Sequence, residues 1–303
     1  MKAFSLKIGL VKLHYLCNQD CVFCWHHQFG DKINGASYSL ERFKKLLVDA
    51  KELGIDTIGL SGGEPLIHKD LKHFVELVYR NEFNLALATN GSLLKYKNYV
   101  KFLKKKRLKY VHFSFYSHNP AIHAKITDSL LFEHSVQGLI NLLKNDIEVL
   151  VNVVIHNYTI KSLTATIDYL FSLGVKNLKL NIVEPTGNVK KNEEIIPDLK
   201  LAVDSKKTAI EYAEKLGMNV IFDGFPLCFV KGFEDNYKDI SSTGIKYISE
   251  AFEDKFYPTH HGNRTKFDVC EGCSKKKLCD GLYTTYLDYY KVEEMSFILR
   301  PYN

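Results

Sequence analysis

Hydrophobic and polar positions along residues 6–222 switch repeatedly between strand-like and helical spacing. Short runs rich in β-branched residues are followed by longer segments with apolar residues every three or four positions. Strands are expected over 6–15, 56–60, 84–88, 110–115, 148–155, 177–182 and 219–222. Helices are expected over 39–53, 68–81, part of 95–109, 129–144, 161–173 and 197–216. Repeated βα units of this length indicate parallel strands with right-handed crossovers, so we expect an α/β fold, a partial (β/α)6 TIM-like barrel.

The regular pattern ends near residue 222. Beyond it, Gly, Pro, aromatic and charged residues mix without clear periodicity, and four of the 7 cysteines appear. We therefore expect two domains, a barrel over residues 1–222 and a small C-terminal domain over residues 223–303.

The composition is that of an ordinary soluble protein, with 46% hydrophobic and 25% charged residues. No apolar run approaches the roughly 20 residues that span a membrane, and residues 1–7 show no apolar targeting segment. We expect a cytoplasmic protein whose cysteines are metal ligands rather than disulfides. The net charge of +6 is mild, and its densest source, 95–109, reads as a solvated helix face. Neither membranes nor nucleic acids are therefore expected partners.

Three cysteines follow the first expected strand, at Cys17, Cys21 and Cys24. A turn this short cannot bury three thiols in three separate places, but it can wrap them around one soft metal centre. A four-iron cluster held by three thiolates would leave one iron open for a ligand that is not protein. The spacing alone also allows a zinc knuckle with a distant fourth ligand, or three unrelated buried cysteines.

This cysteine spacing, with the aromatic Phe23 before the third cysteine, resembles that of the radical S-adenosylmethionine (SAM) superfamily. A second motif, Ser61-Gly62-Gly63-Glu64-Pro65, follows the second expected strand and resembles the Gly-Gly-Glu-Pro motif of that superfamily. In such enzymes the motif holds the amino group of SAM, and a [4Fe-4S] cluster with an open iron binds the SAM amine and carboxylate. The resemblance implies that Cys17, Cys21 and Cys24 hold the cluster.

Further SAM contacts are expected at the carboxyl ends of the barrel strands, where parallel barrels place their reacting groups. By the same resemblance, Phe23 would contact the adenine through its backbone. Asn90 and Ser114 resemble the strand-end residues that bind the SAM carboxylate or ribose, with Asn152 as a further candidate. The first step needs no acid–base pair, because the cofactor supplies the chemistry.

The remaining cysteines, Cys228, Cys270, Cys273 and Cys279, resemble the auxiliary-cluster segment of the SPASM and twitch subfamilies. The full SPASM pattern continues with a further cysteine where this chain has Tyr283, so one auxiliary [4Fe-4S] cluster, as in twitch domains, fits better. A four-cysteine zinc site would use the same ligands and stays open. His260 and His261 lie between these cysteines and are possible substitute ligands.

A fully thiolate-ligated auxiliary cluster has no open iron for a substrate, so it would accept or relay electrons. Similar enzymes most often modify ribosomally made peptides or oxidise a residue of a partner protein, which makes a radical SAM oxidoreductase or maturase the favoured expectation. The alternative is a dehydrogenase or rearrangement enzyme acting on a small molecule such as a nucleotide or sugar. An alternative of another class is a non-catalytic zinc or iron–sulfur interaction protein. Flavodoxin or ferredoxin is the expected electron donor.

The small-molecule alternative predicts polar side chains above the SAM site. Strand-end candidates for contacting such a substrate are Tyr116, His156, Glu184 and Asp223. The sequence does not identify the substrate or the bond formed.

Overall fold

The computed structural model describes residues 6–238, 244–259, 263–295 and 298–302. Its main sheet has nine strands in the order β7-β6-β5-β4-β3-β2-β1-β8-β9, and every neighbouring pair is parallel except β8 with β9. The strands are β1 (Ile8–Lys12), β2 (Thr57–Ser61), β3 (Asn84–Thr89), β4 (Leu108–Ser114), β5 (Glu148–Ile155), β6 (Asn177–Ile182), β7 (Asn219–Asp223), β8 (Ile245–Ser249) and β9 (Tyr257–Pro258). A separate antiparallel pair joins β10 (Arg264–Thr265) to β11 (Leu282–Tyr283).

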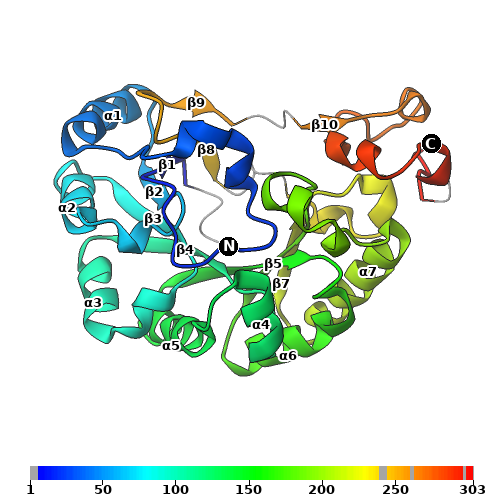
Figure 1. Ribbon diagram of the computed structural model, residues 1–303, viewed down its shortest axis with the longest axis horizontal. Helices are drawn as coiled ribbons and strands as arrows, with labels where there is room; N and C mark the ends of the chain where they lie inside the picture. Colours follow the sequence, from blue (N-terminus) through cyan, green and yellow to red (C-terminus); the bar gives the residue numbers. More distant parts are fainter. Residues whose placement is uncertain (1–5, 239–243, 260–262, 296–297, 303) are drawn as a thin grey trace.

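In the described ranges, the seven α-helices surround the sheet in an arc that runs from α1 at the upper left to α7 at the right (Figure 1). They are α1 (Leu40–Glu52), α2 (Leu71–Arg80), α3 (Lys97–Lys105), α4 (Pro120–Thr127), α5 (Phe132–Leu143), α6 (Leu163–Ser172) and α7 (Leu199–Lys215). Because β7 and β9 are the two ends of the sheet, the barrel stays open, and the expected partial TIM-like barrel is confirmed. None of the helices in the described ranges is long and apolar enough to cross a membrane.

Two layers of side chains form the core. Outward-facing strand residues pack against the helices in one large cluster, whereas a small inner cluster fills the floor of the barrel. The inner cluster comprises Ile8, Ala86, Tyr110, Leu150 and Ile221. Since successive side chains of a strand alternate between faces, the next inward positions along the same strands are available for chemistry.

Most elements agree with the periodicity of the sequence. Strands β5 and β6 have the expected bounds, and Ser39 caps α1 by accepting a hydrogen bond from the Arg42 backbone N–H. The expected strand 6–15 is shorter, because the chain leaves the sheet after Lys12 to form the cysteine loop. Helix α4 was not expected; it begins at Pro120 and is capped by the Asn119 side chain.

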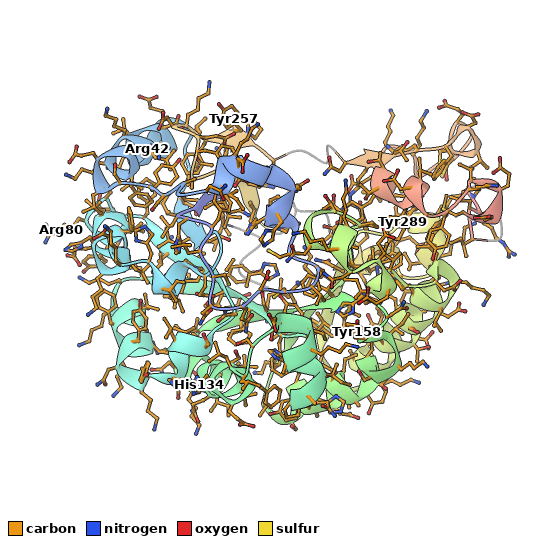
Figure 2. The ribbon with its side chains drawn as sticks, viewed as in Figure 1. Arg42, Arg80, His134, Tyr158, Tyr257 and Tyr289 are labelled. Atoms are coloured by element: carbon orange, nitrogen blue, oxygen red, sulfur yellow. The ribbon has the colours of Figure 1, made fainter. Side chains whose placement is uncertain are left out.

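The largest surprise is β8, which lies beyond the expected boundary at 222 and pairs in parallel with β1. The loop after β8 is held to α1 by Arg42, whose guanidinium donates to the carbonyls of Ala251 and Glu253 and to Asp254. Figure 2 shows Arg42 and Tyr257, the first residue of β9, near one another at the upper left. Part of the segment after 222 therefore extends the barrel sheet, and the division into domains 1–222 and 223–303 stays a prediction.

Candidate active site

The three N-terminal cysteines share the loop after β1, with Cys17 exposed and Cys21 and Cys24 half-buried. Desolvation by the surrounding loop raises the pKa of each thiol, to about 11 for Cys17, and the neighbouring thiols raise the pKa of Cys21 further. The Cys24 backbone N–H donates to the Cys21 carbonyl at 2.9 Å, which closes the turn. Thiols kept neutral by burial must lose their protons when a metal binds, so this loop fits an iron–sulfur cluster by its donor set.

Asparagines from other strand ends hold this loop in place. The Asn90 amide donates to the Asn18 side-chain oxygen at 2.8 Å, and the Asn18 amide donates to the Ser92 hydroxyl at 2.9 Å. On the other side, the Asn188 amide donates to the Asp20 carboxylate at 2.9 Å and to the Cys21 carbonyl at 3.0 Å. The loops after β3 and β6 therefore position the cysteines, a role for Asn18 and Asn188 that the sequence reasoning did not assign.

The glycine pair after β2 lies against the backbone of the cysteine loop. A Cβ on Gly62 would stand 2.1 Å from the carbonyl oxygen of His14, and one on Gly63 would stand 2.0 Å from that of Leu16. The Gly63 and Glu64 backbone N–H groups donate to the same two carbonyls at 2.8 and 2.9 Å. Contacts within the protein itself therefore require glycine at both positions, because any side chain would displace the cysteine loop.

Glu64 is buried and accepts three hydrogen bonds. Its carboxylate receives the Thr89 hydroxyl at 2.7 Å and the backbone N–H groups of Asn90 and Leu66 at 2.8 and 3.0 Å. Burial raises the pKa of Glu64 to about 7, against the effect of these donors. Pro65 follows it as the first residue of the short 3-10 helix Pro65–Ile67. The carboxylate is therefore held rigidly between the ends of β2 and β3, and its expected bond to SAM stays a prediction.

Phe23 packs beside two buried strand-end residues that the sequence singled out. Its ring centroid lies 4.9 Å from that of Tyr116 and 5.4 Å from that of His156. Burial lowers the pKa of His156 to about 3, and its Nδ1 accepts the Tyr158 backbone N–H at 3.2 Å. The neutral ring therefore carries its proton on Nε2, which has no partner among the residues that the structure describes.

Ser114 and Asn152 lie opposite each other in the registered pair β4–β5. Both are half-buried, and the Asn152 side-chain oxygen accepts the Asn181 amide at 3.1 Å. His112 joins the same inward row, where burial lowers its pKa to about 3. This row extends across three strands and gives the barrel interior a polar layer above its apolar floor.

A group of buried charges closes the row at the end of β7. Asp223 lies 3.8 Å from the Lys179 ammonium and accepts a hydrogen bond from Arg264 Nη2 at 2.8 Å. Burial alone would raise the pKa of Asp223, but Lys179 and Arg264 outweigh it and lower that pKa. Arg264 comes from β10 and stacks its guanidinium 4.3 Å from the Tyr283 ring centroid. Sequence reasoning found Asp223 but missed both cations, since neither lies in a recognisable motif.

The remaining strand-end candidate, Glu184, lies near this group and accepts a hydrogen bond from the Asn263 amide at 3.0 Å. Burial raises the pKa of Glu184. The possible substitute ligands His260 and His261 lie outside the described residues.

Lys12, at the end of β1, is a third buried cation that the sequence did not reveal. Its ammonium lies 3.1 Å from His26 Nε2 and 4.3 Å from the ring centroid of Trp25. Burial lowers the pKa of Lys12, while Glu250, directly after β8, raises it. Strand β8 thus places a carboxylate at the same mouth of the barrel as the cysteine loop.

The four C-terminal cysteines line a single pocket. The segment after β10, which carries three of them, lies at the upper right of Figure 1. Burial, with smaller contributions from the other three thiols, raises the pKa of Cys228 to about 12. Backbone N–H groups point at two of the sulfurs, from Leu227 to Cys279 at 3.3 Å and from Tyr302 to Cys273 at 3.4 Å. Four thiols with N–H donors fit a thiolate-ligated metal group. Within the described ranges, no three His, Cys, Asp or Glu side chains are gathered closely enough to hold one metal ion.

Comparison with known proteins adds a family and a set of relatives. A family model described as "Radical SAM superfamily" matches residues 11–170. The chain is 33% identical over 220 residues to the GTP 3',8-cyclase of Nautilia profundicola, which covers 70% of this chain and 65% of that protein. It is 30% identical over 175 residues to a probable GTP 3',8-cyclase of Methanopyrus kandleri, covering 57% and 55%. The chain thus spans less than two thirds of the length of both relatives.

Solved structures with the same fold are more distant in sequence. Streptococcus suis SuiB bound to its precursor peptide SuiA has a TM-score of 0.69 at 14% identity, covering 97% of this chain and 76% of that one. The enzyme anSMEcpe, with bound AdoMet and the Cp18Cys peptide, has a TM-score of 0.69 at 16% identity, covering 94% and 91%. At these identities the likeness establishes the fold alone.

Proposed function

The chain belongs to the radical SAM superfamily, and from that membership we propose that it is an enzyme acting on a nucleotide-class small molecule. In this superfamily a reduced [4Fe-4S] cluster delivers one electron to SAM, and the resulting 5′-deoxyadenosyl radical removes a hydrogen atom from the substrate. Cys17, Cys21 and Cys24 are proposed as the cluster ligands, because they share one short loop after β1 and their thiols are soft-metal donors.

The SAM site is proposed at the mouth of the barrel beside that loop. Glu64 would receive the SAM ammonium, and its three existing hydrogen bonds would hold the carboxylate in place. Phe23 and the strand-end residues Asn90, Ser114 and Asn152 are proposed as the further SAM contacts. Glu64 and Asn90 are buried, and limited access of water to such a site protects a reactive radical from side reactions.

The names of the curated relatives carry the substrate class. Two relatives at 30% identity or more are named GTP 3',8-cyclases, and a nucleotide triphosphate is a polyanion. This chain places two buried cations, Lys179 and Arg264, beside the carboxylate of Asp223, with Glu184 nearby. Cationic side chains at this end of the barrel fit the anionic groups of such a substrate.

The relatives favour this small-molecule alternative over the peptide-modifying maturase that the sequence favoured. Their names also favour a cyclase, which joins two atoms of one substrate, over an oxidoreductase. The peptide-bound structural neighbours do not weigh against this, because their likeness extends only to the fold.

The C-terminal cysteines are proposed to hold an auxiliary [4Fe-4S] cluster in a SPASM/twitch-like domain over 223–303. The support is that all four thiols line one pocket and that two receive backbone N–H groups. Such a cluster would supply electron transfer next to the substrate, with flavodoxin or ferredoxin as the proposed reductant.

The decisive experiment is anaerobic reconstitution of the wild type beside a Cys17/Cys21/Cys24→Ala variant. About eight irons are expected in the wild type and about four in the variant, since each cluster holds four. After dithionite reduction with SAM, 5′-deoxyadenosine is measured with GTP, with ATP, with UTP and without substrate. GTP labelled with deuterium on its ribose would pass the label to 5′-deoxyadenosine if the nucleotide is the substrate.

Each arm tests a separate part of the proposal. Loss of cleavage in the variant supports the radical mechanism, whereas cleavage that survives there contradicts the assigned ligands. Deuterium transfer from one nucleotide supports the substrate class. Cleavage that no nucleotide stimulates or labels contradicts it. Four irons with one zinc in the wild type would remove the auxiliary cluster.

A further inference from the structure

Tyr302 bridges two parts of the C-terminal cysteine pocket that lie far apart in the chain. Cys228 follows β7, whereas Cys270, Cys273 and Cys279 form a compact group some forty residues later. Nothing in the sequence pattern indicates how these two parts are kept together. Tyr302 lines the pocket and contacts both of them.

The backbone of Tyr302 binds the compact group. Its N–H donates to the Cys273 sulfur at 3.4 Å, and its carbonyl accepts the Ser274 N–H at 3.0 Å. One bond is donated by Tyr302 to the Cys273 side chain, and the other is accepted by Tyr302 from the Ser274 backbone. The two hydrogen bonds hold the backbone of Tyr302 in direct contact with Cys273 and Ser274.

The side chain of Tyr302 reaches the other part. Its hydroxyl lies 3.2 Å from the Leu227 carbonyl and also bonds the Glu234 carboxylate. Leu227 directly precedes Cys228, and its N–H donates to the Cys279 sulfur at 3.3 Å. The phenol therefore ties down the residue that presents Cys228 and bonds Cys279.

Lys231 strengthens the same connection. Its ammonium donates to the Pro301 carbonyl at 3.0 Å and lies 4.7 Å from the ring centroid of Tyr302. The ring is thus held from the same loop, 227–234, that its hydroxyl contacts. Tyr302 is half-buried and packs against the edge of the main hydrophobic core, so its polar contacts act beside an apolar one.

We propose that Tyr302 is a positioning residue for the auxiliary metal site, which it assembles from its two parts and whose Cys273 thiolate it stabilises through its N–H. The inference rests on the proposed auxiliary cluster. Hydrogen bonds to ligand sulfurs set the reduction potential of iron–sulfur clusters, and removal of groups that orient metal ligands typically costs 10–100-fold in metal affinity. Tyr302 would therefore govern both the retention and the potential of the metal group.

Three substitutions separate the parts of this role. Tyr302→Phe removes the hydroxyl, Tyr302→Ala removes the ring as well, and Tyr302→Pro removes the ring and the N–H. Comparing Pro with Ala isolates the N–H bond to Cys273. Tyr289→Phe is the matched control, because Tyr289, labelled in Figure 2, is likewise half-buried, donates its hydroxyl to Glu193 and does not line the pocket. All are made in the full-length Cys17/Cys21/Cys24→Ala background, in which only the auxiliary site can load.

Two quantities are measured anaerobically: the rate of iron release to a chelator, and the midpoint potential by EPR-monitored titration. Tyr302→Ala is expected to release iron at least about tenfold faster than the parent, with Tyr302→Phe between the two. Tyr302→Pro is expected to shift the potential to a more negative value than Tyr302→Ala. Tyr289→Phe is expected to match the parent.

Each outcome bears on a different claim. A parent without iron in this site would contradict the auxiliary cluster itself. A loaded parent whose Tyr302 variants all release iron at the parental rate would overturn the positioning role while leaving the cluster intact. Equal potentials in the Ala and Pro variants would overturn the N–H contribution. Circular dichroism of each apo variant shows whether the barrel is folded. If Tyr302→Pro is misfolded, the positioning role is tested by comparing Tyr302→Phe with Tyr302→Ala.

Discussion

Gly62 is the position at which one added methyl group tests how the cysteine loop is built. Its φ of +130° belongs to a region that only glycine adopts readily, and its Cβ would meet the His14 carbonyl oxygen at 2.1 Å. That carbonyl also accepts the Gly63 N–H at 2.8 Å. In Gly62→Ala, therefore, the backbone before the first cysteine must move and this hydrogen bond must stretch or break.

The expected loss of stability follows from three contributions. The unfavourable φ costs about 1–3 kcal/mol, the lost hydrogen bond about 1 kcal/mol and the steric conflict about 1–3 kcal/mol. Together these lower the free energy of unfolding by about 3–7 kcal/mol. Few single substitutions cost this much, so the effect is readily measured.

Gly174→Ala is a matched control, because Gly174 also has a positive φ, +93°, but nothing lies within 4 Å of its Cβ position. Only the backbone contribution applies there, so Gly62→Ala should be less stable than Gly174→Ala by about 2–4 kcal/mol. Urea unfolding of the reduced apoproteins measures the difference, and iron content after reconstitution shows whether the loop still loads. Equal stabilities together with full iron loading would refute the close approach between the glycine motif and the cysteine loop.

Three further predictions concern buried titratable groups. His123 has no hydrogen-bond partner for either ring nitrogen within the described chain, so His123→Leu should raise the free energy of unfolding by about 1–2 kcal/mol; a loss in a thermal melt would reveal a missed partner. Asp223→Asn should cost about 3–5 kcal/mol in urea unfolding, because Lys179 and Arg264 would lose the buried carboxylate that both contact, and an unchanged midpoint would contradict this ion group. Burial and a neighbouring lysine lower the pKa of His26 to about 2. Because the pKa of histidine in the unfolded chain is about 6.5, the stability that neutral His26 contributes is present above about pH 6.5 and is lost as the pH falls below it. The urea midpoint should therefore fall between pH 7.5 and 5.5, and less steeply in His26→Phe; identical pH profiles would exclude His26 as a cause.

Local spacing was enough to predict most of the barrel. The strands 148–155 and 177–182 were predicted to the residue, because β-branched runs flanked by turn residues have few alternatives in a parallel sheet. The cysteine loop and the glycine motif were equally visible, since each places its chemistry within a few consecutive residues. The short helix α4 escaped because its apolar residues do not gather on one side.

Contacts between distant segments were decided only by the folded chain. Strand β8 pairs with β1 across more than two hundred residues, and it lies where the sequence shows no periodicity. Arg264 reaches Asp223, and Tyr302 reaches Cys273, from equally irregular stretches. These contacts depend on which surfaces the folded barrel leaves open at its edge and mouth. The residues adjacent in sequence to each partner do not indicate them. The sequence alone therefore determined the barrel and the cofactor motif, whereas tertiary structure determined how the C-terminal segment completes the site.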